Sequence, residues 1–184
     1  MSFQVGKIYS LACLAALILS LPSSLKAGLE VKVFPNNKFC LVVPKYPNTK
    51  IGDSEYSGGT TVWCRRNITS QGSTGHFNDG FWTRANLSYP KMGVVQITGC
   101  INPYACDRLN PHDDGGQYDS NGGQSGSGNP AGSFCSPYGS YVQLIEPSAR
   151  RACIRCCTNP ADCDTSHDTQ GCKAAIPGDY YGCE

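Results

Sequence analysis

The sequence is poor in charge, and this shortage excludes several classes of protein. Only 16% of its 184 residues are charged, and 15 Lys and Arg against 14 Asp and Glu give a net charge of +1. A helical bundle or coiled coil is richer in Lys and Glu, and a nucleic-acid-binding domain needs a strongly basic face. We therefore expect neither a helical protein nor a nucleic-acid partner.

Motifs for catalysis and for cofactors are also lacking. The histidines (His76, His112 and His167) are far apart, and none belongs to an H-E-x-x-H pair. The sequence has no G-x-S-x-G nucleophile elbow and no glycine-rich phosphate fingerprint. We accordingly name no catalytic, cofactor-binding or metal-binding residue and favour a function that is not enzymatic.

The longest apolar run lies at the N-terminus and has the layout of a secretory signal peptide. Lys7 precedes the apolar stretch 11–21, Pro22 ends it, and small residues follow up to Ala27. The run has half of the ~20 residues that a membrane-spanning helix needs. We predict a signal peptide at 1–27 and a single extracellular domain at 28–184, with no membrane attachment after cleavage.

Cysteine is abundant where charge is not. Removing Cys13 with the signal peptide leaves eleven of the twelve cysteines, and dense cysteine in a secreted chain predicts a disulfide framework. An odd number leaves one thiol over, and Cys106, in a loop-like stretch just after Cys100, is the candidate, either free or paired with another molecule. The ten cysteines expected to form bridges, in a pairing that the sequence does not give, are Cys40, Cys64, Cys100, Cys135, Cys153, Cys156, Cys157, Cys163, Cys172 and Cys183.

Two short cysteine patterns need their own interpretation. Cys156 and Cys157 are adjacent, and neighbouring cysteines rarely satisfy disulfide geometry with each other, so each is expected to reach a different partner. Cys153 and Cys156 have C-x-x-C spacing, which also suits zinc or a redox pair. Thiols behind a signal peptide are normally oxidised, so we prefer the disulfide interpretation.

Short apolar runs separated by turn residues predict a β-rich fold with little helix and long loops rich in Gly and Pro. In the runs 94–98 and 141–146, apolar and polar residues alternate, which predicts strands that are buried on one face only. Asn159-Pro160 can begin a short helix near Pro160–Cys163. The predicted strands are Val31–Phe34, Phe39–Val43, Thr60–Cys64, Gly93–Cys100, Ser140–Ile145 and Ala152–Cys156.

The polar, glycine-rich stretch 110–133 is predicted to be a long loop, either functional or disordered. It holds Asp113, Asp114 and Asp119 beside His112. Two carboxylates at a fixed separation suit a glycoside hydrolase and alternating oxygens suit calcium, but the spacing matches neither signature. Aspartates that bond their own backbone in turns are the simpler interpretation. A carboxylate-dependent hydrolase is kept as an alternative.

Surface features suggest two further kinds of site. The sequons Asn67-Ile68-Thr69 and Asn86-Leu87-Ser88 predict N-glycosylation at Asn67 and Asn86. The aromatic-rich stretch 75–82 ends at Trp82, and an exposed indole can stack on a sugar, although aromatics more often pack in a core. Trp82 is therefore the candidate ligand contact of a second alternative, a module that binds cell-wall polysaccharide.

A larger pattern covers about half of the chain. Its most specific block is RACIRCC at 151–157. The other segments are 95–101 (VQITGCI), 109–111 (LNP), 113–120 (DDGGQYDS), 128–133 (GNPAGS), 141–142, 146–147, 160–163 (PADC), 168–169, 171–172 and 176–178, with 39–44 (FCLVVP) fitting more loosely. Together these segments resemble a family of small secreted, cysteine-rich fungal proteins of basidiomycetes and mucoromycetes.

The resemblance implies an origin and a compartment rather than a reaction, because no activity is established for the family. Cys106 is extra to the family pattern, which implies five bridges among the other ten cysteines. The leading expectation is therefore a secreted fungal protein that acts at the cell surface or in the extracellular medium, effector-like toward a host. Its expected partner is a host protein or a wall polysaccharide.

Overall fold

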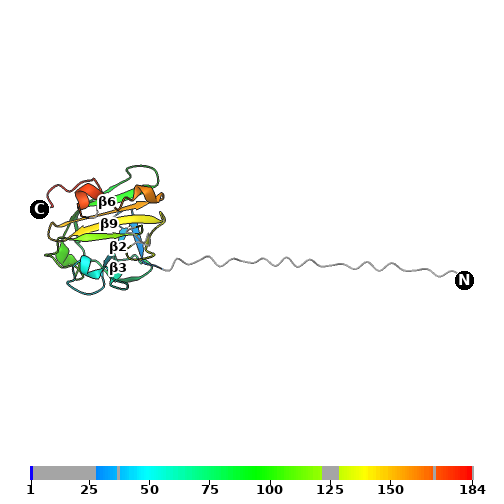
Figure 1. The fold of residues 1–184 in the computed structure, drawn as a ribbon, viewed down its shortest axis with the longest axis horizontal. Helices are drawn as coiled ribbons and strands as arrows, with labels where there is room; N and C mark the ends of the chain where they lie inside the picture. Colours follow the sequence, from blue (N-terminus) through cyan, green and yellow to red (C-terminus); the bar gives the residue numbers. More distant parts are fainter. Residues whose placement is uncertain (2–27, 37, 122–128, 168, 184) are drawn as a thin grey trace.

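The computed structural model describes Met1 and residues 28–36, 38–121, 129–167 and 169–183 (Figure 1). Apart from Met1, the predicted signal peptide lies outside the described residues, as does the part of the predicted loop at 122–128. No helix within the described ranges is long and apolar enough to cross a membrane.

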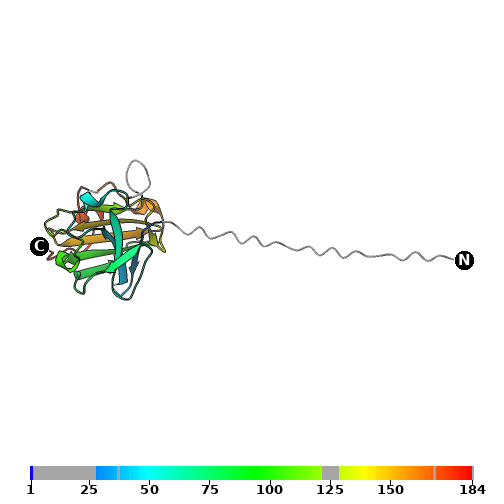
Figure 2. The same ribbon diagram turned by 90° about the horizontal axis from the view of Figure 1, so that it is seen from below.

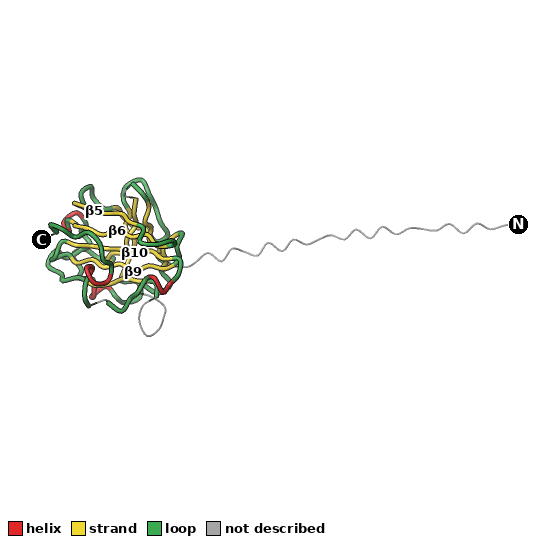
Figure 3. Tube along the Cα trace, turned by 90° about the horizontal axis from the view of Figure 1, so that it is seen from above, coloured by secondary structure: helices red, strands yellow, loops and turns green. Residues whose placement is uncertain are grey.

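The described residues form two five-stranded sheets (Figure 1). The first sheet has the order β4-β3-β2-β1-β8 and consists of β1 (Glu30–Phe34), β2 (Lys38–Pro44), β3 (Thr60–Cys64), β4 (Ser73–His76) and β8 (Phe134–Ser136). The second has the order β5-β6-β10-β9-β7 and consists of β5 (Trp82–Ser88), β6 (Val94–Ile101), β7 (Gly116–Asp119), β9 (Ser140–Glu146) and β10 (Arg151–Cys157). Strands β5, β6, β10 and β9 lie side by side in Figure 3.

Helix is scarce, so the predicted β-rich class is confirmed. The predicted helix near Pro160 is a single 3-10 turn, in which the Asn159 side chain accepts a hydrogen bond from the Ala161 N–H. The helical elements of the described chain are the 3-10 turns η1 (Gly52–Ser54), η2 (Pro103–Ala105) and η3 (Pro160–Asp162) and the short helix α1 (Cys172–Ala175).

All six predicted strands are present, and the described chain adds β4, β5, β7 and β8. Strand β7 corrects the prediction of an uninterrupted loop at 110–133, because Gly116–Asp119 pairs antiparallel with β9. After β7, Asp119 exchanges two backbone hydrogen bonds with Asn129, at 2.8 and 2.9 Å. Tyr118, completely buried, anchors β7 in the core between the sheets.

The first core lies between the two sheets, whose strands cross each other (Figure 2). It contains Val33, Leu41 and Val62 from the first sheet and Ile97 and Ile154 from the second. Burial of such aliphatic side chains stabilises the fold by about 1.5–3 kcal/mol each. The two sheets therefore share one apolar interface.

A glutamine side chain bridges the sheets inside this core. Gln143 of β9 is fully buried; its Nε2 donates to the Val42 carbonyl at 2.8 Å, and its Oε1 accepts from the Val42 N–H at 3.0 Å. Strand β1 pairs with β2 only from Lys32 to Phe34. The backbone N–H and carbonyl of Val42 lie beyond this paired stretch and need another partner. The amide of Gln143 serves as that partner and behaves like one residue of a missing strand.

A second core covers the outer face of the second sheet. It combines Val142 and Leu144 of β9 with Ile176 and Tyr180 of the C-terminal segment, residues 160–183. Every residue of β6 and of β9 is buried. The prediction that 94–98 and 141–146 are half-buried strands is therefore wrong. In β6 the C-terminal segment covers the polar face of Gln96 and Thr98, whereas in β9 the polar face of Gln143 packs against the first sheet.

The polar residues on that outer face are bonded to the segment that covers them. Gln96 donates from Nε2 to the Pro177 carbonyl at 3.0 Å and accepts from Nε of Arg155 at 3.0 Å. The Thr98 hydroxyl accepts from the Asp179 N–H at 3.0 Å. Buried polar groups are tolerated when they are hydrogen-bonded, which explains how a polar strand face can be covered.

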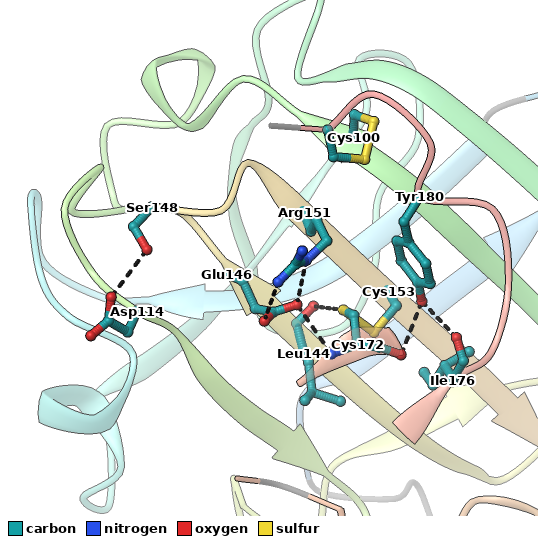
Figure 4. Close-up of polar contacts among 11 residues, drawn as sticks. Cys100, Asp114, Leu144, Glu146, Ser148, Arg151, Cys153, Cys172, Ile176 and Tyr180 are labelled. Carbon is teal, nitrogen blue, oxygen red and sulfur yellow. Dashed lines mark hydrogen bonds and ion pairs between the residues drawn. A yellow bond between two sulfur atoms is a disulfide. The ribbon is translucent and has the colours of Figure 1, made fainter. Parts of the chain in front are cut away.

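An ion pair holds the start of α1 against the second sheet (Figure 4). Arg151 donates from Nε and Nη2 to the two carboxylate oxygens of Glu146, each at 3.1 Å. The same carboxylate accepts from the Cys172 N–H at 3.1 Å. Tyr180 adds a hydrogen bond from its hydroxyl to the Ile176 carbonyl at 2.6 Å.

Disulfides join these layers. Cys40–Cys64 links β2 to β3, and Cys135–Cys156 links the first sheet to the second. The remaining bridges of the described chain attach the C-terminal segment to the second sheet: Cys153–Cys172, Cys157–Cys163 and Cys100–Cys183. The two cores and the bridges together make a small, cysteine-rich, β-rich domain.

Candidate functional site

Strand β10 sends its cysteines to opposite faces, as alternate residues of a strand must. Cys156 lies in the core between the sheets, whereas Cys153 and Cys157 lie in the outer core. The adjacent pair Cys156 and Cys157 therefore reaches different partners, as expected. The C-x-x-C pair is split between the two faces, and both of its cysteines are bonded elsewhere.

Among the residues described, no group of three or more His, Cys, Asp or Glu side chains is placed to hold a metal ion.

Cys106 is the only free cysteine among those that the structure describes, and it is buried. Burial raises the pKa of its thiol to about 12. The thiolate is the reactive form of cysteine, so this thiol is inert near neutral pH. Its burial also places it away from any partner molecule at the surface.

The side chains of the three loop aspartates accept hydrogen bonds from other groups of the same chain. Asp113 is buried and accepts from the Ile51 N–H at 2.7 Å, which fixes the turn before η1. Asp119 is buried and accepts from the Asn121 N–H at 2.8 Å. Asp114 is exposed and accepts from the Ser148 hydroxyl at 3.1 Å (Figure 4). These contacts favour the structural interpretation of the aspartates over the hydrolase.

The surroundings of the aspartates agree with that interpretation. Four pockets among the described residues are lined by other side chains, and each of these four contains at most one carboxylate side chain. A glycoside hydrolase needs two carboxylates that face each other across the bond to be cleaved. His112 is exposed, and its backbone N–H donates to Oδ1 of Asn110 at 2.9 Å in a turn.

Trp82 borders a small pocket and also packs in the core. Its ring meets Phe39 and Phe81 edge to face, with centroids 6.1 and 5.7 Å apart. The pocket has a volume of about 180 Å³, with Arg65 and Asp79 on its wall. Ligand sites usually span about 300–1,000 Å³, so this pocket has room for a fragment of a sugar chain. The buried indole N–H lacks a hydrogen-bond partner among the described residues.

Both sequon asparagines are exposed. Asn67 sits in a turn with a φ of 69°, in the left-handed region that asparagine tolerates better than most residues. Asn86 lies on β5, at the edge of the second sheet. A glycan on either side chain would extend into solvent.

A larger pocket, which the sequence does not reveal, lies beside Tyr56. It has a volume of about 530 Å³ and is lined by parts of the segments 28–29, 55–60, 71–72 and 129–131. We call it the Tyr56 pocket. Its walls come from parts of the chain that are far apart in sequence, so no local pattern could have indicated it. A tyrosine before Ser-Gly-Gly gives only a turn signal.

Comparison of the chain with protein-family models, with curated proteins and with solved structures finds no match. The site therefore has to be interpreted from its own geometry.

Proposed function

We propose that the chain is a secreted fungal protein that acts without catalysis at the cell surface or in the extracellular medium, effector-like toward a host. The observation that carries the proposal is the set of five disulfides in the described chain. Such density is typical of extracellular domains, because cytosolic thiols are kept reduced. Each bridge typically stabilises a small domain by about 2–4 kcal/mol. The resemblance to small secreted fungal proteins and the apolar N-terminal stretch support the same compartment.

Expression of the full chain in a secreting fungal or yeast host tests this proposal. The protein is expected in the medium, beginning at Gly28, with no thiol accessible to alkylation while folded and one thiol, Cys106, accessible after denaturation without reduction. Burial of Cys106 and the raised pKa of its thiol account for the protection. Intact mass before and after alkylation gives both numbers. Retention in the cell, or four or more labelled thiols, would contradict the proposal.

The same mass spectra test the glycans. We expect enzymatic deglycosylation to lower the mass of the protein by the glycans at Asn67 and Asn86. In Asn67→Gln or Asn86→Gln, the mass lost on deglycosylation should fall by the glycan of that position.

A second candidate, binding of cell-wall polysaccharide, is supported by Trp82. Its ring borders the 180 Å³ pocket, and its indole N–H is unpaired in the described structure. In a pull-down of the secreted, deglycosylated protein on chitin, β-glucan and cellulose, this candidate predicts retention by at least one polymer and no release of soluble sugar. Trp82→Phe keeps an aromatic ring for packing and is expected to weaken retention several-fold. Release of sugar would instead revive the hydrolase alternative.

A further inference from the structure

We propose that the Tyr56 pocket binds a neutral oligosaccharide, with one sugar ring lying on the ring of Tyr56. The proposal deepens the second candidate function and rests on it, because it presumes an extracellular polysaccharide as the source of the ligand. It adds a sugar contact that is separate from the one at Trp82. The volume of about 530 Å³ lies in the usual range for ligand sites.

The Tyr56 side chain is an open, supported platform. The residue is 56% exposed. Gly59 lies against its ring so closely that a Cβ at Gly59 would come within 2.8 Å of Cε1 of Tyr56. The turn is closed by a hydrogen bond from the Gly59 N–H to the Tyr56 carbonyl at 2.9 Å. Tyrosine supplies a large contact area at low cost in conformational entropy, and here the backbone already limits its motion.

The lining carries no net charge in the secreted protein. Glu55 is its only charged side chain, and it contains no Lys or Arg. The wall also includes Gly28, whose α-amino group is a cation in a chain that begins at this residue. One carboxylate and one ammonium offset each other, which suits a neutral ligand better than a charged one.

The uncharged polar residues of the lining suit hydroxyl groups. They are Ser57, Thr60, Gln71 and Asn129, with the hydroxyl of Tyr56. Hydroxyl and amide side chains both donate and accept hydrogen bonds, as do the hydroxyls of a sugar. Leu29 and Pro130 add apolar contact area. A neutral ligand that carries many hydroxyls and one apolar ring face fits this combination.

The walls are fixed by backbone hydrogen bonds before any ligand arrives. The Leu29 carbonyl accepts from the Phe134 N–H at 3.0 Å, and the Gly72 carbonyl accepts from the Val62 N–H at 3.2 Å. The third wall is held where Asn129 exchanges its two bonds with Asp119 of β7. A preformed site loses less entropy on binding than one that must be ordered.

The Tyr56 pocket and the Trp82 pocket lie at opposite ends of the first sheet. Thr60 begins β3 at the Tyr56 pocket, and Arg65, just after β3, lines the Trp82 pocket. Gly72, just before the parallel strand β4, lines the Tyr56 pocket, and Phe77, just after β4, lines the Trp82 pocket. Five residues of strand separate the pockets by about 17 Å. Substitutions at such a distance act independently, so each pocket can serve as the control for the other.

The test is calorimetric titration of the secreted, oxidised and deglycosylated protein with six-sugar oligomers. The neutral probes are cellohexaose, laminarihexaose and chitin hexamer, and the charged probes are hexagalacturonate and chitosan hexamer. We expect at least one neutral hexamer to bind with a Kd below about 1 mM. Tyr56→Ala should weaken it about tenfold, which is about 1.4 kcal/mol, whereas Tyr56→Phe should stay within about threefold. Trp82→Phe should leave this Kd unchanged.

Each other outcome overturns the proposal in a distinct way. Absence of binding by every neutral hexamer, or equal binding by the parent and Tyr56→Ala, would remove the pocket as a sugar site. Binding of a charged hexamer alone would reject the neutral class. Loss of binding in Trp82→Phe with retention in Tyr56→Ala would place the sugar at Trp82. Because Tyr56 is exposed, thermal unfolding of its variants should match the parent. None of these results changes the thiol count or the secretion that test the primary function.

Discussion

Gln143→Leu is expected to lower the free energy of unfolding by about 2–6 kcal/mol, a large part of the stability of a small domain. Leucine has a similar size and suits an apolar core, so hydrophobicity alone predicts a gain. The loss arises because the N–H and the carbonyl of Val42 both bond the Gln143 amide. In the leucine variant, each of these two backbone groups would be buried without this partner, and each would lower the free energy of unfolding by about 1–3 kcal/mol.

Urea denaturation of the oxidised protein measures this effect. Gln170→Leu is the matched control, because Gln170 is exposed and its only hydrogen bond shown here is made by its backbone N–H, to His167. Its stability should stay within about 0.5 kcal/mol of the parent. If Gln143→Leu loses less than about 1 kcal/mol, the amide is not needed to bridge the sheets.

Glu146→Ala is expected to lower the free energy of unfolding by about 3–5 kcal/mol, the usual cost of removing one partner of a buried ion pair. The side chains of Glu146 and Arg151 are only 12% and 17% exposed. Alanine removes the acceptor of both guanidinium hydrogen bonds and of the Cys172 N–H. The start of α1 would then lose its polar anchor.

The same urea series includes two comparisons. Glu146→Gln keeps an oxygen that can accept from the Cys172 N–H, so its loss should be smaller than that of the alanine variant. Lys91→Ala removes one partner of a pair in which the lysine side chain is 58% exposed, and such surface pairs contribute only about 0–1 kcal/mol. Equal losses for Glu146→Ala and Lys91→Ala would show that burial of the pair is energetically irrelevant.

The sequence indicates the strands whose side chains are mostly apolar and misses those that are polar or exposed. Strand β9 is evident from Val142, Leu144 and Ile145. Strand β5 is not evident, because Trp82–Ser88 is a largely exposed edge strand. Its side chains face water, so they do not form the apolar run that marks a buried strand. Strand β7 is hidden in a glycine-rich stretch, where its pairing with β9 depends on residues far along the chain.

The outer core is missed for a different reason. Its cover, residues 160–183, contains few aliphatic side chains, so a hydrophobic pattern does not reveal it. Bridges such as Cys153–Cys172 and hydrogen bonds to Gln96 and Thr98 hold it in place. The number of cysteines suggests such staples, but their pairing depends on the fold. Of the candidate sites, the sequence points to Trp82, whereas the Tyr56 pocket appears only when four distant segments meet.

The C-terminal segment is tied to the sheet at several points, and this changes what backbone cleavage can do. Lys173 is exposed, one residue after Cys172. If a trypsin-like protease cut after Lys173, Cys153–Cys172 would hold the new chain end against β10, and Cys100–Cys183 would bond the downstream piece to the rest of the protein. The cut would release no peptide while the disulfides are intact. In a digestive environment the protein would therefore carry a broken backbone in this segment and keep all of its parts.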